Sequence, residues 1–405
     1  MKDEQLKLLN FYKSMSAIAT NLVGAFIPLI VYKYTGSLVL AVLYMVGVYI
    51  VRFLTTLVFR KLMFKYAQLF ILLRFLPIIL YSIFLFLLDV NVILAVIGTG
   101  IFVGVSDSFS SLPNEIVHNY SSLNKGSSSV GITVFFEKIG VIAAFVAGGL
   151  FLDYLAQWIL VLASLILYLI SVIPLAVYFI KNRNSKGFNN EAVSNAVITF
   201  SENPDKSQRG KKLSRKMMIE YGFAYFLYNV STPVITFFSL YLFIKNGEFA
   251  IVGYLTAAYN AAVMITSLFA GKLDQKKDLT VFVWLGFLIF GITKASLILT
   301  NFVWLWFISF VIMGLIEGIV NVFVLERMRS KTRILGVSNE ALFSRYKGQC
   351  LGSVTTSLFF IATAPLFLPV FIFLSVADVI AGTYIVTHEE KARKTLVRYL
   401  QGDDE

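Results

Sequence analysis

The chain has 405 residues, of which 58% are apolar and 14% are charged, with a net charge of +12 and a mean hydropathy of +0.79. Soluble globular chains contain roughly 45–50% apolar and ~25% charged residues, so this composition excludes a soluble fold and makes the lipid bilayer the solvent. The single cysteine, Cys350, excludes an internal disulfide and a cysteine-based metal cluster. We therefore expect an all-α membrane protein that holds no metal and no cofactor.

Apolar runs of about 20 residues, the length that spans ~30 Å of hydrocarbon, recur along the whole chain. The runs are 10–32, 36–58, 67–88, 91–112, 128–151, 157–180, 217–244, 249–271, 279–299, 302–325, 344–364 and 367–387. They predict about twelve transmembrane helices in two six-helix halves (6+6). The expected domains are a bundle at 1–180, a cytoplasmic linker at 181–214, a second bundle at 215–388 and a cytoplasmic tail at 389–405.

The placement of the basic residues predicts the orientation of these helices. If the N-terminus is inside, the outer connections carry only Lys33 and Lys245, whereas most other Lys and Arg residues fall on the inner side. Basic residues favour cytoplasmic loops, so their excess is an orientation signal and not a nucleic-acid surface. Both termini are expected in the cytoplasm. The first residues lack a cleavable signal pattern, and the Lys- and Asn-rich loops fit a bacterial plasma membrane.

A repeat at one offset links the two halves. Four residues recur 210 positions later, pairing Tyr44 with Tyr254, Tyr49 with Tyr259, Gly104 with Gly314, and Asp107 with the acidic Glu317. Internal duplication of hydrophobic helices is typical of secondary transporters. We expect the halves to be related by a pseudo-twofold axis, with one embedded acid at the same place in each.

The loop after the predicted helix 249–271 carries a motif. Gly271, Asp274 and Lys276 stand in an order and spacing that resemble motif A of the major facilitator superfamily of secondary transporters. The resemblance implies a cytoplasmic latch, in which the glycine permits close helix packing and the acid engages a helix end and basic partners. The matching loop of the first half, 59–65, keeps the basic residues but lacks the glycine and the acid.

A second resemblance lies in the predicted helix 128–151. Its glycines are Gly131, Gly140, Gly148 and Gly149. Their spacing resembles motif C, the antiporter pattern of the same superfamily, although Ala144 and Phe145 stand where that pattern has Gly-Pro. Such residues make a thin helix face that a neighbour can approach closely, and generic helix packing is the alternative interpretation. The arginine that drug antiporters of this family carry in helix four is absent from 98–104.

The family's fold places helices 1, 4, 7 and 10 around a central cavity, so the resemblance puts Asp107 and Glu317 there. Each acid lies three residues after a glycine, Gly104 or Gly314, on one helix face. A charge inside a membrane helix costs ~3 kcal/mol or more, so an embedded acid indicates function by default. We predict that Asp107 and Glu317 take part in proton coupling. The alternative is that each makes a structural pair with a basic residue.

Glu137 is a third candidate for proton coupling, and its neighbour Lys138 points about 100° away around the same helix. We expect Lys138 to neutralise Asp107 and Glu137 to meet Arg74, which together would form an ion network. Direct contact with substrate is the alternative for these residues.

Other charged residues fall within predicted spans without an assigned function. Arg52 and Arg74 lie near the cytoplasmic ends of their helices, and Lys294 lies near an outer end. Snorkelling, in which the long side chain reaches the interface, accounts for all three. Asp378 lies mid-helix and needs a partner that the sequence does not identify.

Polar residues of the predicted cavity suggest the kind of solute. The candidates for its lining are Asn21, Tyr221, Tyr225, Asn229 and Asn321. Aromatic and amide groups suit an amphipathic organic molecule, through stacking and a few hydrogen bonds, and aromatic packing between helices is the alternative. A strongly anionic substrate would favour paired arginines; none is clearly placed at the centre, which disfavours sugar phosphates and nucleotides.

The sequence thus predicts a transporter similar to the major facilitators, which moves a small amphipathic or cationic organic solute by alternating access in proton-coupled efflux. The alternatives are solute:proton symport, lipid flipping by the same fold, and a non-transporting sensor or immunity protein. HExxH, Walker A and GxSxG motifs are absent, so we expect no enzyme. The expected partners are the solute, the bilayer and H+, with a monomeric chain and no nucleic acid.

Overall fold

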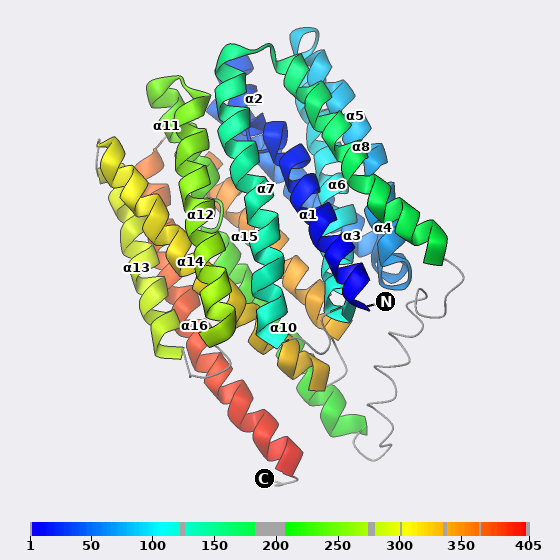
Figure 1. The fold of residues 1–405 in the computed structure, drawn as a ribbon. Helices are drawn as coiled ribbons and strands as arrows, with labels where there is room; N and C mark the ends of the chain where they lie inside the picture. The colour runs from blue at the N-terminus through cyan, green and yellow to red at the C-terminus, as the bar shows by residue number, and fades with distance from the viewer. Residues whose placement is uncertain are drawn as a thin grey trace.

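The computed structural model describes residues 2–121, 126–182, 207–273, 280–299, 302–334, 338–363 and 366–401, which form a bundle of long helices without a strand (Figure 1). The start of the first helix and the end of the last lie toward the same end of the bundle. We call this the terminal end and the opposite one the far end.

The bundle is built from two successive series of helices. The first series is α1 (Lys2–Gly24), α2 (Ile27–Thr35), α3 (Leu38–Lys65), α4 (Ala67–Leu73), α5 (Phe75–Phe86), the short 3-10 helix η1 (Leu87–Asp89), α6 (Val92–Ser121), α7 (Gly126–Tyr154) and α8 (Gln157–Asn182). The second is α10 (Ser207–Ser231), α11 (Val234–Asn246), α12 (Phe249–Leu273), α13 (Thr280–Leu299), α14 (Val303–Ile334), α15 (Ser338–Ala362) and α16 (Phe367–Gln401).

Within the described residues, eleven helical segments are long and apolar enough to cross a membrane. They fit an integral multi-pass membrane protein, as the composition predicts. Large apolar side chains such as Val58, Ile93 and Ile292 are exposed on the helices, which favours contact with lipid over contact with water.

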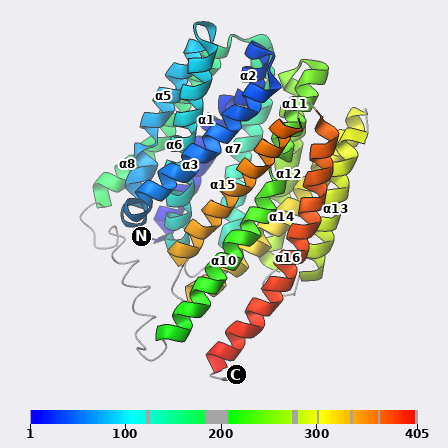
Figure 2. The ribbon, with the colours of Figure 1, turned by 180° about the vertical axis from the view of Figure 1, so that it is seen from behind.

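The helix that covers the predicted span 344–364, α15, does not belong to these eleven. Its sequence is interrupted by Arg345, Lys347 and several Ser and Thr residues. It lies between α3 and α10 and packs against both (Figure 2). Protein neighbours therefore surround much of its surface, and a polar helix is tolerated there.

Each series begins with a broken helix that ends on a glycine. A turn at 25–26 separates α1 from α2, and a turn before α11 contains Pro233. Helix α2 is then capped by Gly36 (φ 62°) and α11 by Gly247 (φ 75°), the two positive φ angles of the described chain. Glycine adopts this conformation without a Cβ clash. The two caps lie 211 residues apart, close to the offset of the sequence repeat.

Glycines of α7 bring this helix close to α12. A methyl group added at Gly131 would lie 2.6 Å from the carbonyl oxygen of Ser267, and one at Gly149 would lie 2.8 Å from that of Phe249. The two glycines are near opposite ends of α7, so the helices touch along most of their length, as Figure 1 also shows.

The other two glycines of α7 serve a different neighbour. A methyl group at Gly140 would clash with the backbone of Ser14, and one at Gly148 would clash with that of Leu22, both in α1. The absence of side chains thus allows α7 to lie between α1 and α12 at backbone-contact distance.

The repeated glycines Gly104 and Gly314 make equivalent contacts. A methyl group at Gly104 of α6 would lie 2.7 Å from the carbonyl oxygen of Val48 in α3, and one at Gly314 of α14 would clash with that of Tyr259 in α12. Val48 and Tyr259 are 211 residues apart. The repeat therefore marks matching helix contacts, in addition to the acids three residues later.

We expect Gly104→Ala to lower the free energy of unfolding by about 1–3 kcal/mol, because overpacking forces the α3 and α6 backbones apart. Thermal unfolding of the purified protein in detergent measures this. Gly47→Ala is the matched control, since a methyl group there meets nothing within 4 Å. The control should gain up to about 1 kcal/mol from helix propensity. Equal stability of the two variants would contradict the close contact.

Candidate functional site

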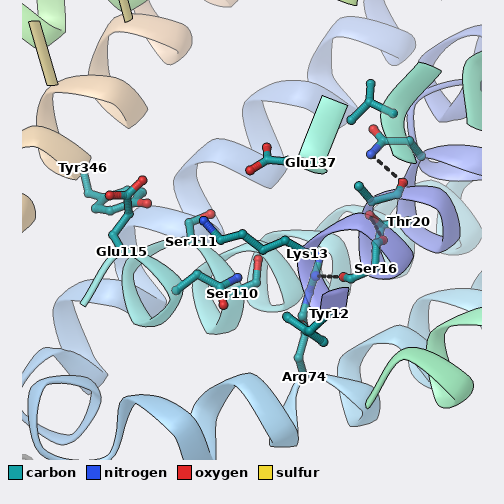
Figure 3. Close-up of a pocket in the computed structure, with 14 residues that line it drawn as sticks. Tyr12, Lys13, Ser16, Thr20, Arg74, Ser110, Ser111, Glu115, Glu137 and Tyr346 are labelled. Atoms are coloured by element: carbon teal, nitrogen blue, oxygen red, sulfur yellow. Dashed lines mark hydrogen bonds between the residues drawn. The ribbon is translucent and has the colours of Figure 1, made fainter. Parts of the chain in front are cut away.

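A polar cavity of about 250 Å³ lies among α1, α6 and α7 (Figure 3). Its lining residues are Tyr12, Lys13, Ser16, Ala17, Thr20, Asn21, Arg74, Ser110, Ser111, Asn114, Glu115, Glu137, Val141 and Tyr346. Tyr346 comes from α15, so both helix series contribute. Lys13 lies in the first turn of the span Asn10–Thr35, and Glu115 lies near the end of the span Val92–Val117. Both positions place the cavity toward the terminal end.

Arg74 holds one wall of this cavity in place. It lies at the junction of α4 and α5 and is only 6% exposed. Its Nη1 donates to the hydroxyl of Ser16 (2.9 Å) and its Nε to that of Ser106 (3.1 Å). Its Nη2 lies 3.9 Å from a carboxylate oxygen of Asp107. The snorkelling expected for Arg74 is therefore wrong, because the guanidinium stays inside the bundle where hydrogen bonds and a counter-charge compensate its burial.

Asp107 is paired with Arg74 and does not line the cavity. Its side chain is 38% exposed, so the carboxylate is not sealed in the core. Of the acids predicted for proton coupling, Glu137 is the one in the cavity wall, and Asp107 is linked to that wall through Arg74.

Glu115 is an acid of the cavity that the sequence analysis missed. It forms an ion pair with Arg345 of α15, at 3.6 Å between nitrogen and oxygen. The guanidinium of Arg345 also lies over the ring of Tyr225, 4.9 Å from its centre. These contacts join the first helix series to the second at the terminal end. The signal for Glu115 was its position eight residues after Asp107, on the same helix face.

Two charged residues of the cavity have no counter-ion among the residues that the structure describes. Neither Lys13 of α1 nor Glu137 of α7 makes an ion pair or hydrogen bond with another residue that the structure describes. In the same cavity, the buried side-chain oxygen of Asn114 also lacks a hydrogen-bond partner within the described chain. As far as the described residues go, the cavity therefore presents an uncompensated cation and an uncompensated anion to whatever enters it.

Lys138 is directed away from Asp107. Its ammonium donates a 2.7 Å hydrogen bond to the side-chain oxygen of Asn260 in α12. The pairing of Lys138 with Asp107 that we expected is thus not formed, because Arg74 takes that position. The expected pairing of Glu137 with Arg74 is not formed either. The contact adds a polar link where α7 and α12 touch.

Of the residues predicted to line the cavity, Asn21 does so and three others lie elsewhere in the bundle. Asn21 lines the cavity, and its amide nitrogen donates to the backbone oxygen of Ala17. Tyr221, Tyr225 and Asn229 do not line it. Tyr225 and Asn229 are buried, and the two tyrosines pack within the hydrophobic core.

Glu317 of α14 is partly buried and lies within electrostatic range of Tyr228, but it is not a lining residue of the cavity. The side chain of Asn321, which we predicted beside it, lies outside the described part. So do Asp274 and Lys276 of the predicted latch, whereas Gly271 is in the last turn of α12.

Lys294 and Asp378 form a buried ion pair away from the cavity. The ammonium of Lys294 lies 2.7 Å from a carboxylate oxygen of Asp378, and both side chains are 0% exposed. The same ammonium donates to the backbone oxygen of Ser231 (3.2 Å), at the end of α10 where the helix is interrupted. The snorkelling expected for Lys294 is therefore wrong, and Lys294 is the partner that Asp378 required.

The far end of the bundle is closed by aromatic packing. Phe26 packs against Phe249 with ring centres 6.1 Å apart, and Phe249 against Phe243 at 4.5 Å. Both carboxylate oxygens of Asp153, at the end of α7, accept hydrogen bonds from the first backbone N–H groups of α12. An acid at a helix N-terminus is a stabilising cap. The two helix series are thus joined tightly here, whereas the terminal end holds the cavity.

No group of three or more His, Cys, Asp or Glu side chains in the described ranges could hold a metal ion. The arrangement is suited to binding a small polar solute through charge and hydrogen bonds. No protein-family model matches the chain, and no curated protein matches it by sequence.

Proposed function

We propose that the chain is a secondary active transporter of the major facilitator type, with six-helix halves at 1–180 and 215–388 related by a pseudo-twofold axis. The matching glycine caps Gly36 and Gly247 support the duplication, as do the matching contacts of Gly104 and Gly314. Contacts of α7 with α12 and of α3 with α15 would form the interface between the halves.

The observation that carries this proposal is the difference between the two ends of the bundle. Helices of the first series line a polar cavity toward the terminal end, to which α15 of the second series contributes Tyr346, while aromatic rings pack together at the far end. In alternating access, a central site opens to one side of the membrane at a time. The structure would correspond to a state that is closed at the far end and is bridged at the terminal end by the Glu115–Arg345 pair. The basic loops support a cytoplasmic location for the terminal end.

The proposed cargo is a small amphipathic or cationic organic solute, exported from the cell by exchange for protons across the plasma membrane. Acids in and beside the cavity support the proton as the coupling ion. Glu137 lies in the wall and Asp107 lies next to it, while Glu317 occupies the repeated position in the second half. Binding of a solute changes the environment of such a carboxyl and can drive release or uptake of its proton.

Solute-triggered proton flux in proteoliposomes tests this function. We expect flux with the wild-type protein and its loss in Asp107→Asn, Glu317→Gln or Glu137→Gln, whichever residue carries the proton. The matched control is Glu248→Gln, which removes an exposed acid outside the cavity. Solute transport that persists without proton flux in all variants would favour facilitation or lipid flipping. Absence of transport for every solute class would favour a sensor or immunity protein.

A further inference from the structure

The cavity holds four charged side chains, and two of them are already compensated by the protein. Arg74 pairs with the carboxylate of Asp107 and donates hydrogen bonds to two serine hydroxyls. Glu115 is neutralised by Arg345. These two groups form part of the cavity walls, but their charges are compensated by contacts within the protein.

Lys13 and Glu137 are the other two, and their charges remain uncompensated by any described residue. They come from different walls, α1 and α7, and both are partly buried. Figure 3 shows Lys13 extending across the cavity toward Ser111, with Glu137 on a separate wall. A partly buried charge without a counter-charge is unfavourable, so a ligand that supplies one gains binding energy.

A ligand with a single charge would leave either Lys13 or Glu137 uncompensated. We infer that the cavity binds a small zwitterion that carries an ammonium and a carboxylate, with the carboxylate at Lys13 and the ammonium at Glu137. The volume of about 250 Å³ is below the roughly 300–1,000 Å³ of pockets for drug-sized ligands and fits a solute of amino-acid size. This inference rests on the proposed function and narrows its substrate class.

Binding to the purified full-length protein tests the inference. The probes are alanine, leucine, γ-aminobutyrate and 6-aminohexanoate, which differ in the distance between their charges. Each is compared with its amide, which keeps only the cation, and with its N-acetyl derivative, which keeps only the anion. Because one charge-assisted contact is lost in each derivative, we expect at least one zwitterion to bind about tenfold more tightly than both of its derivatives. If no zwitterion binds, or if a derivative binds equally well, the inference is wrong.

Two variants assign the ends of the ligand. In Lys13→Gln the amide should bind as well as the zwitterion, and in Glu137→Gln the N-acetyl derivative should. Neither residue has a partner in the described protein, so neither substitution should lower the unfolding temperature; a change of selectivity is then not an effect of misfolding. Lys61→Gln and Glu248→Gln, which remove exposed charges outside the cavity, should keep the wild-type selectivity. Variants at Lys13 and Glu137 that also keep it would overturn the assignment.

Uptake of the same probes into proteoliposomes separates this inference from the proposed function. If only amides are transported, transport stands and the zwitterion inference fails. If zwitterions bind selectively but nothing crosses the membrane, the site assignment stands and the transport proposal fails.

Discussion

Replacing Lys294 by methionine is expected to lower the free energy of unfolding by about 3–5 kcal/mol, because it leaves the carboxylate of Asp378 buried without a counter-charge. Both side chains are 0% exposed, and the pair joins α13 to α16. The lysine also supplies a donor to Ser231, where α10 is interrupted. Thermal unfolding of the purified protein in detergent, followed by tryptophan fluorescence, measures the loss.

The double variant Lys294→Met/Asp378→Val provides the decisive comparison. Removing both charges together leaves no unpaired ion, so stability should return to the wild-type value or exceed it. Lys61→Met, at an exposed position, is the control for loss of a lysine and should change stability by no more than about 0.5 kcal/mol. A Lys294→Met variant as stable as this control would show that the pair contributes nothing.

This ion pair also shows what the sequence could not provide. The hydropathy of the helices around Lys294 and Asp378 predicts their spans, because each span depends only on its own residues. The pairing depends on two residues that lie 84 positions apart in the chain, on different helices. A lysine near a helix end suggests snorkelling as long as its neighbours are unknown, and only the packing of α13 against α16 places a carboxylate beside it.

The spans themselves follow the sequence closely. The predicted run 10–32 corresponds to the span Asn10–Thr35, and 157–180 to Gln157–Val177, because about 20 apolar residues specify a membrane helix by length alone. A proline accompanies each break: Pro28 lies in the first turn of α2, where proline is tolerated, and Pro233 is the residue directly before α11.

The cavity could be predicted only in part. We expected a helix end at 112, before Pro113, but α6 continues through this proline to Ser121. Glu115 therefore lies inside the bundle and not in a loop, which explains why the sequence missed it. Asn21 and Glu137 were found because polar residues inside apolar helices are conspicuous. Among the described residues, Arg74 and Glu115 are paired, whereas Lys13 and Glu137 are not. This difference depends on contacts between helices, which the sequence does not indicate.

Linking α6 to α15 across the Glu115–Arg345 ion pair is expected to abolish transport. This pair joins the two helix series at the terminal end, where alternating access requires the proposed halves to separate and approach during each cycle. Cys350 is the single native cysteine, so a Cys350→Ser background allows Glu115→Cys and Arg345→Cys to be introduced together. A thiol-reactive cross-linker with a reducible bridge should stop solute uptake into proteoliposomes, and a reductant should restore it.

The two single-cysteine variants, treated with the same reagent, are the matched controls. Each loses the same ion pair and carries the same adduct, yet the helices stay unlinked, so any loss of rate in these controls measures the effect of an adduct in or beside the cavity. Comparing the pair with these controls separates the effect of immobilising the halves from the effect of removing the charges. If the linked protein, verified by mass spectrometry, transports as fast as the controls, α6 and α15 do not move apart during the cycle. The rocking of two rigid halves would then be the wrong mechanism, even for a protein that transports its solute.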